Sequence, residues 1–76
     1  METRTIKLSQ IEEVKEFVNA ASDCDFDIDI AYNRVVIDAK SLLGVLSLDL
    51  NRVLYVTCRG YSQSFEQTLN KFAYAS

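Results

Sequence analysis

Three aspartates at alternating positions are the densest set of chemically capable side chains in the sequence. Asp25, Asp27 and Asp29 are separated by apolar residues, and carboxylates on one side of a strand suggest a cation site. Same-face neighbours along a strand lie about 7 Å apart, too far for three carboxylates to hold one ion without help from other strands. The predicted neighbouring strands supply Arg34 and Arg59 instead. The pattern therefore predicts a solvated sheet face with cross-strand charge pairs and no metal site.

Candidate nucleophiles and bases are few. Cys24 and Cys58 are the only thiols, and no Cys-x-x-Cys spacing accompanies them. Both lie in strand-like stretches, which favours buried reduced thiols over a disulfide or a redox pair. The sequence contains no histidine, so an imidazole acid, base, metal ligand or phosphoryl acceptor is excluded. There is also no phosphate-binding glycine loop, so we expect no catalytic residues, no cofactor and no enzyme activity.

Length and composition predict one small folded domain over residues 1–76. The sequence is 49% hydrophobic and 25% charged, which is ordinary for a globular domain that needs no metal or disulfide. A formal charge of -3 argues against a nucleic-acid partner, whose phosphates require a basic surface. No apolar run reaches the roughly 20 residues of a spanning helix. Residues 1–5 lack the apolar segment of an export signal, so we expect a cytoplasmic protein without membrane insertion.

The N-terminal third of the chain is typical of a strand followed by an amphipathic helix. Residues 3–8 alternate in polarity and are rich in β-branched side chains. Ser9 and Glu12 have the spacing of a capping box, which predicts that the Ser9 hydroxyl caps a helix over residues 10–21. The expected buried face of this helix consists of Ile11, Val14, Phe17, Val18 and Ala21.

The remaining elements follow from the same patterns. Residues 24–30 alternate strictly, which predicts a strand with one face toward water. Tyr32 and Asn33 are predicted to turn the chain into a returning strand over residues 34–39. Three more elements are expected: a short helix over residues 41–48 capped by Ser41, a strand over residues 53–59, and a final helix capped by Ser62 or Ser64 with Phe65, Leu69, Phe72 and Ala73 buried.

This order of elements, β-α-β-β-α-β-α, contains no repeat and no proline. Strands with one polar face and amphipathic helices pack best as two layers. We therefore predict an α+β fold with the helices on one face of an antiparallel sheet.

The segment over residues 39–48, Ala-Lys-Ser-Leu-Leu-Gly-Val-Leu-Ser-Leu, carries a more specific signal. With the element order and the hairpin turn, it resembles the histidine-containing phosphocarrier (HPr) family of the bacterial sugar phosphotransferase system. The Lys-Ser-[Ile/Leu]-x-Gly-[Val/Leu]-[Met/Leu]-Ser-Leu pattern is the distinctive part of this match. The resemblance implies an open-faced β-sandwich, with four antiparallel strands in the order 1-4-2-3 and three helices on one face.

The central chemistry of that family does not carry over. HPr proteins take a phosphoryl group on a histidine in a Gly-x-His-x-Arg-Pro segment between the first strand and the first helix. Residues 8–11 occupy that place here, without histidine, arginine or proline, so the usual relay from phosphoenolpyruvate is excluded. Ser9 is a poor substitute, because a serine phosphoester passes its group on less readily and the hydroxyl is predicted to cap the helix.

The resemblance also implies a regulatory site. Ser41 matches the serine that a dedicated kinase phosphorylates in many Gram-positive members, which is then presented to a transcriptional regulator. A phosphate there would meet the N-terminal end of a helix, with Lys40 adjacent. The alternative is that Ser41 is an unmodified helix cap, and the sequence leaves both possibilities open.

Leu42, Leu43 and Leu46 match the positions of the exposed apolar patch with which the family docks onto its partners. So short a helix cannot bury all three leucines, and an exposed cluster of this kind marks an interface. The alternative is local packing against the region of Tyr55 or Tyr61.

Together these observations predict an HPr-like, non-catalytic regulatory or protein-interaction module, with Ser41 phosphorylation as its candidate control. The expected partners are proteins: phosphotransferase-system components, a serine kinase or a transcriptional regulator. Two alternatives stay open, namely a phosphocarrier that uses an atypical acceptor residue and a structural subunit of an oligomer. The predicted partner-binding residues are Lys40, Leu42, Leu43 and Leu46.

Overall fold

One antiparallel sheet and a layer of helices make up the computed structural model, which describes residues 2–74. The strands lie in the order β1-β4-β2-β3, and each neighbouring pair is antiparallel. The α+β class and the order 1-4-2-3 are therefore confirmed. In chain order the elements are β1 (Glu2–Lys7), α1 (Ile11–Ser22), β2 (Ile28–Tyr32), β3 (Val35–Asp38), α2 (Leu42–Leu46), β4 (Val53–Cys58) and α3 (Gln63–Phe72).

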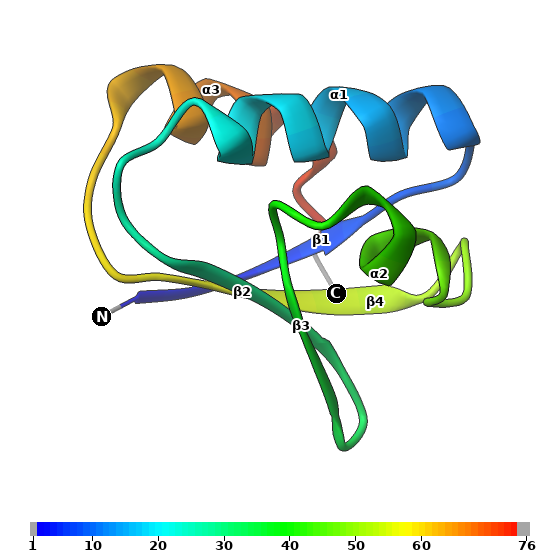
Figure 1. Ribbon diagram of the computed structural model, residues 1–76. Coiled ribbons are helices and arrows are strands. Elements are labelled where there is room, and N and C mark those ends of the chain that lie inside the picture. The colour runs from blue at the N-terminus through cyan, green and yellow to red at the C-terminus, as the bar shows by residue number, and fades with distance from the viewer. Residues whose placement is uncertain (1, 75–76) are drawn as a thin grey trace.

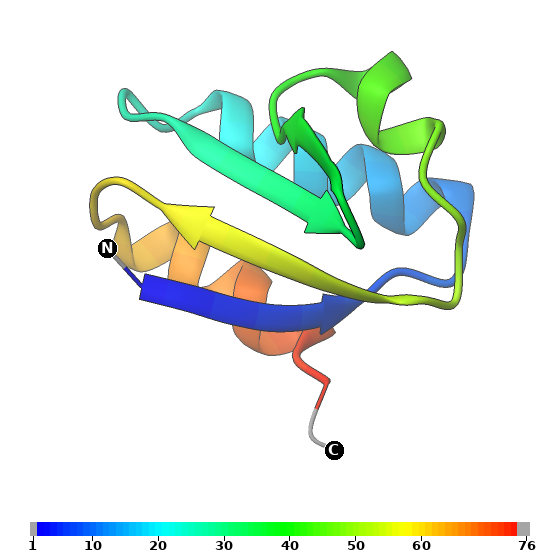
Figure 2. The same ribbon diagram turned by 90° about the horizontal axis from the view of Figure 1, so that it is seen from below.

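The helices cover one face of the sheet and leave the other face open. Figure 1 shows α1 and α3 side by side above the strands, with α2 close to β3 at one end. In Figure 2, which views the molecule from below, the strands face the viewer without a helix in front of them. None of the helices within residues 2–74 is long and apolar enough to cross a membrane.

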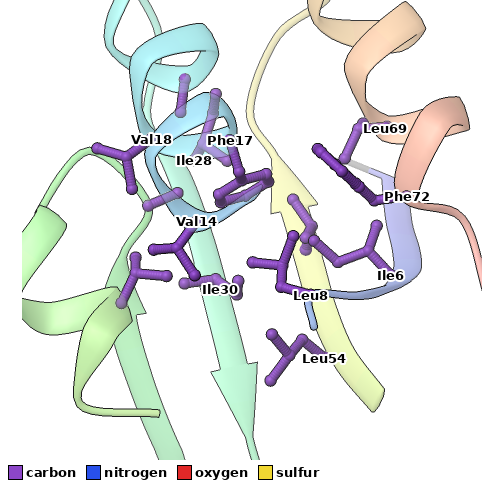
Figure 3. Close-up of a cluster of buried hydrophobic side chains, with 14 of the residues drawn as sticks. Ile6, Leu8, Val14, Phe17, Val18, Ile28, Ile30, Leu54, Leu69 and Phe72 are labelled. Atoms are coloured by element: carbon purple, nitrogen blue, oxygen red, sulfur yellow. The ribbon is translucent and has the colours of Figure 1, made fainter. Parts of the chain in front are cut away.

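The core fills the space between the sheet and the helices (Figure 3). Alternate strand residues such as Ile28 and Ile30 point into it and are completely buried, as period two requires. The rings of Phe17 on α1 and Phe65 on α3 meet with their centroids 5.8 Å apart. Cys24 is buried in the same core, as is Cys58 on β4, and both cysteines are reduced. The predicted buried, reduced cysteines are confirmed.

The β2–β3 hairpin turns through Asn33 and Arg34, one residue later than the predicted pair Tyr32 and Asn33. Tyr32 is the last residue of β2 and pairs with Val35. Asn33 has a φ of 55°, a left-handed conformation that asparagine tolerates better than most residues.

The strand predicted over residues 24–30 is too long, because β2 begins only at Ile28. Residues 24–27 carry the chain from the end of α1 down to the sheet, and the N–H of Cys24 still bonds to the carbonyl of Ala21 at 3.1 Å. The Phe26 ring packs against Gly60, where a Cβ atom would come within 2.5 Å of it. Polarity alternates through this connection although the strand has not yet begun.

Two predictions for α1 are wrong at its first turn. The N-cap is Gln10, and no side chain caps the helix there. Ser9 contributes its backbone N–H instead, which donates to Oε1 of Glu13 at 2.7 Å, so the reciprocal contact comes from Glu13 and not from Glu12. Ile11 is also misassigned, because it is 51% exposed at the start of the helix, whereas the other four apolar residues of the stripe are buried.

α3 is capped by Ser62, whose hydroxyl accepts from the N–H of Phe65 at 3.3 Å. Its predicted stripe is right except for Ala73, which lies exposed beyond the helix end and forms an isolated bridge with Ile6 on β1.

Arg4 on β1 donates to Oε1 of Glu66 and to Oδ1 of Asn70, which joins β1 to α3.

The predicted cross-strand charge pairs are half right. Arg59 lies 3.1 Å from the carboxylate of Asp29, which confirms a pair on the open face. Arg34 is in the hairpin turn, and within residues 2–74 it forms no ion pair with any of the three aspartates.

Candidate docking site

The segment that leads from β3 into α2 is tied firmly to the sheet. Ala39 is completely buried, and its N–H donates to the carbonyl of Ile28 at 2.9 Å. The N–H of Ser41 then donates to the carbonyl of Asp38 at 3.0 Å, which turns the chain away from the strand. α2 therefore starts from a fixed point beside β3, as seen in Figure 1.

Ser41 caps α2, as the sequence predicts. Its backbone is extended and its hydroxyl accepts from the N–H of Gly44 at 3.1 Å. At the other end, the hydroxyl of Ser47 donates to the carbonyl of Gly44. Two side-chain hydrogen bonds thus hold a helix of only five residues, which is too short to be stable by itself.

The apolar residues of α2 divide between core and solvent. Val45 is only 2% exposed and fixes the rotation of the helix, with Leu48 buried just after it. On the outer side Leu43 is 83% exposed, whereas Leu42 and Leu46 are more than half covered, at 39% and 37% exposed. We call Leu42, Leu43 and Leu46 the leucine patch. The alternative of local packing does not apply to Leu43, whose side chain is almost completely in solvent.

Lys40 is held within the fold. Its ammonium donates to the carbonyl of Cys24 at 2.9 Å, and its backbone N–H donates to Oδ1 of Asp38 at 2.9 Å. The ammonium therefore links the segment before α2 to the connection after α1. Its predicted part in partner binding stays a prediction, and it would have to leave the carbonyl of Cys24 to serve as a counter-charge at Ser41.

The connection between β1 and α1 contains no histidine. Between β1 and α1, Leu8 is buried and its carbonyl accepts from the N–H of Asn51 at 2.8 Å, while Ser9 is exposed. The first turn of α1 carries Glu12 and Glu13. An anion at this helix end would meet two carboxylates, so the end is electrostatically unsuited to a phosphoryl group.

Ile11 is an exposed apolar residue that sequence reasoning placed in the core. It begins α1, and this end of α1 lies at the same end of the molecule as α2 in both Figures 1 and 2. Its position in the first turn of a helix was the available signal, because a helix end often extends past the core that covers its middle.

Residues 2–74 contain no group of three acidic, cysteine or histidine side chains that could hold a metal ion.

No protein-family model matches the chain, and no curated protein sequence matches it either. Solved structures do match over nearly the whole length. HPr-C-His from Thermoanaerobacter tengcongensis superposes with a TM-score of 0.75 at 22% identity, covering 93% of this chain and 89% of that one. The phosphocarrier protein HPr from Bacillus anthracis str. Ames gives a TM-score of 0.70 at 23% identity, with 95% and 92% covered. The chain thus has the HPr fold, an open-faced β-sandwich, and the resemblance seen in the sequence is confirmed at the level of the fold.

Proposed function

We propose that this chain is an HPr-like interaction module of the sugar phosphotransferase system that binds protein partners through the leucine patch and does not carry phosphate. The observation behind the proposal is the exposure of Leu43 on a helix whose rotation is fixed by the burial of Val45. Large apolar side chains held in water by a rigid scaffold favour docking to a second protein. The absence of histidine removes the usual acceptor.

A direct test uses phosphoenolpyruvate and the enzyme that phosphorylates HPr. We expect no acid-labile phosphate on this chain, while an HPr protein with its histidine becomes labelled in the same mixture. Appearance of a transferable phosphate on this chain would support the alternative of an atypical acceptor residue and would contradict the proposal. Ser9→Ala would then show whether the exposed Ser9 takes the group.

Binding is tested separately by titrating isotope-labelled chain with the same enzyme and with the kinase and regulator that recognise HPr. We expect the amide signals of residues 41–47 to shift on binding at least one of these proteins. Leu43→Lys should abolish the shifts, and Thr57→Lys on the open face of the sheet is the matched control that should leave them unchanged. Equal effects of the two lysines would exclude the leucine patch as the docking surface.

We further propose Ser41 as the site that controls docking. Ser41 is exposed and sits directly before Leu42 and Leu43, so a phosphate would add roughly two negative charges at the edge of the patch. Incubation with the kinase should add an acid-stable phosphate to the chain and not to Ser41→Ala. A phosphate that appears equally in Ser41→Ala would place the modification elsewhere.

A further inference from the structure

The two edges of the sheet are not equivalent. On the β1 edge, the chain after α3 runs alongside the strand. The N–H of Tyr74 donates to the carbonyl of Thr5 at 3.1 Å, and the hydroxyl of Thr5 donates to the carbonyl of Tyr74 at 3.0 Å. On the β3 edge, no strand within residues 2–74 pairs with the outer side of Val35–Asp38. One edge is covered, and the other has no partner strand in the described part of the chain; on it the carbonyl of Asp38 accepts from the N–H of Ser41, and the backbone of Val36 faces outward.

The open edge is also apolar. Val36 is 64% exposed and Val35 is 49% exposed. Natural sheet edges are usually protected by lysine, proline or a bulge, and none of these occurs in Val35–Asp38. Figure 1 shows this hairpin extending away from the helical layer, so α2 does not cover its outer half.

A second copy of the chain fits this edge in one register. Antiparallel pairing about a two-fold axis at Val36 places Arg34 of each copy opposite Asp38 of the other, on the same face of the sheet. An axis at Ile37 would instead oppose Arg34 to Lys40, two like charges. An axis at Val35 would oppose Val36 to Arg34 and would create no charge pair. Only the register centred on Val36 is complementary.

The two charged groups are available for such a pair. Arg34 forms no ion pair within residues 2–74, and neither does Asp38, whose Oδ1 accepts only from the backbone N–H of Lys40. On β2, Asp29 lies opposite Asp38 in register, and Asp29 already pairs with Arg59. An arginine from a second copy would give Asp38 a counter-charge of its own.

The same register joins two apolar rows. On the open face, Tyr55 pairs with Ala31, and Ala31 pairs with Val36. Pairing at Val36 continues this row from one copy into the next, with the helices of both copies on the same side. The additional apolar contact falls at the centre of the interface, where it excludes water best.

We infer that β3 is a self-association edge, at which two copies of this chain pair antiparallel about Val36 into one continuous eight-stranded sheet. The inference does not depend on the leucine patch. Because each copy contributes one short strand, the interface is small and the dimer is expected to be weak.

The test is sedimentation equilibrium of the intact chain from about 10 µM to about 1 mM. The expected mass rises from 8.6 kDa toward twice that value with concentration. Arg34→Asp and Asp38→Arg should each raise the dimer Kd about tenfold, since each replaces both charge pairs by like charges. The double variant Arg34→Asp with Asp38→Arg reverses both charges and should return the Kd to within about threefold of the wild type.

Two controls make the result decisive. Val36→Lys opposes two ammonium groups at the axis and should leave only monomer, while far-UV circular dichroism confirms that the variant is folded. Leu43→Lys lies on α2 and should leave the Kd unchanged. A mass of 8.6 kDa at every concentration overturns the inference, as does a double variant that fails to recover or a dimer lost with Leu43→Lys.

Discussion

Gly44 on α2 lies so close to Ile37 on β3 that a Cβ atom on the glycine would be 2.5 Å from Cγ2 of the isoleucine. Real Cβ atoms do not approach a neighbour this closely, so only glycine allows the helix to rest at this distance from the strand. The same hypothetical Cβ would lie 3.0 Å from the hydroxyl oxygen of Ser41. Gly44 therefore allows α2 to pack closely against β3 and leaves space for the Ser41 cap. Both contacts fix the orientation of the leucine patch.

Replacing Gly44 by alanine should lower the free energy of unfolding by about 1–3 kcal/mol because of overpacking against Ile37. The sign of the change in the free energy of unfolding separates two effects. Helix propensity alone would make the alanine variant more stable by about 1 kcal/mol. Urea denaturation of both proteins measures the difference. If the clash is the cause, the same replacement in an Ile37→Ala background should cost less, and equal costs in the two backgrounds would refute the explanation.

The division of α2 into a buried and an exposed side predicts opposite outcomes for neighbouring truncations. Val45→Ala should reduce the free energy of unfolding by about 2 kcal/mol, because the side chain is fully buried and a cavity remains. Leu43→Ala removes more atoms but should change stability by less than about 0.5 kcal/mol, because those atoms are already in water. Denaturant melts of the two variants test this. A larger loss for Leu43→Ala would mean that the leucine packs within the fold.

The strands and helices of this fold follow well from the sequence wherever a pattern is local. The capped start of α2 at Ser41, the hairpin near Asn33 and the buried stripe of α3 all depend on residues within a few positions of each other. The order of the strands is different, because nothing in the local pattern says which strands meet. That order came only with the resemblance to HPr carried by residues 39–48.

Most errors fall where distant contacts decide, and one, at the start of α1, is a choice between two local partners. Residues 24–27 alternate like a strand, but the Phe26 ring is held by Gly60 from another part of the chain. At α1, two glutamates could reach back to Ser9, and the structure uses Glu13. For the candidate docking site, the exposure of Leu43 could be predicted by counting how many leucines a short helix can bury. The hydrogen bond from Lys40 to the carbonyl of Cys24 could not be predicted, because it joins two segments that no sequence pattern brings together.

The contact between β1 and α3 can be tested with a double-mutant cycle. Arg4 donates to both Glu66 and Asn70, four residues apart on one helix, and the Arg4 and Glu66 side chains are largely withdrawn from solvent. Arg4→Met and Glu66→Gln should show a coupling energy of about 1 kcal/mol in urea unfolding, which is larger than for an exposed ion pair. Lys71→Met with Glu16→Gln is the matched control, because that pair is more exposed and should couple by less than about 0.5 kcal/mol. Equal coupling in the two cycles would contradict the structural role given to Arg4.

The two serines that precede helices should differ in their effect on stability. Ser41→Ala removes a hydroxyl that accepts from the N–H of Gly44, so it should cost about 1 kcal/mol. Ser9→Ala should change stability by less than about 0.5 kcal/mol, because only the backbone of Ser9 bonds to Glu13. Ser41→Asp should stay close to the wild type, since aspartate is an equally good cap. Thermal and urea unfolding of the three variants measure the difference. A large loss of stability in Ser9→Ala would mean that the Ser9 hydroxyl caps α1 after all.

If Ser41→Asp is as stable as expected, any loss of partner binding in that variant comes from its charge and not from an unfolded α2.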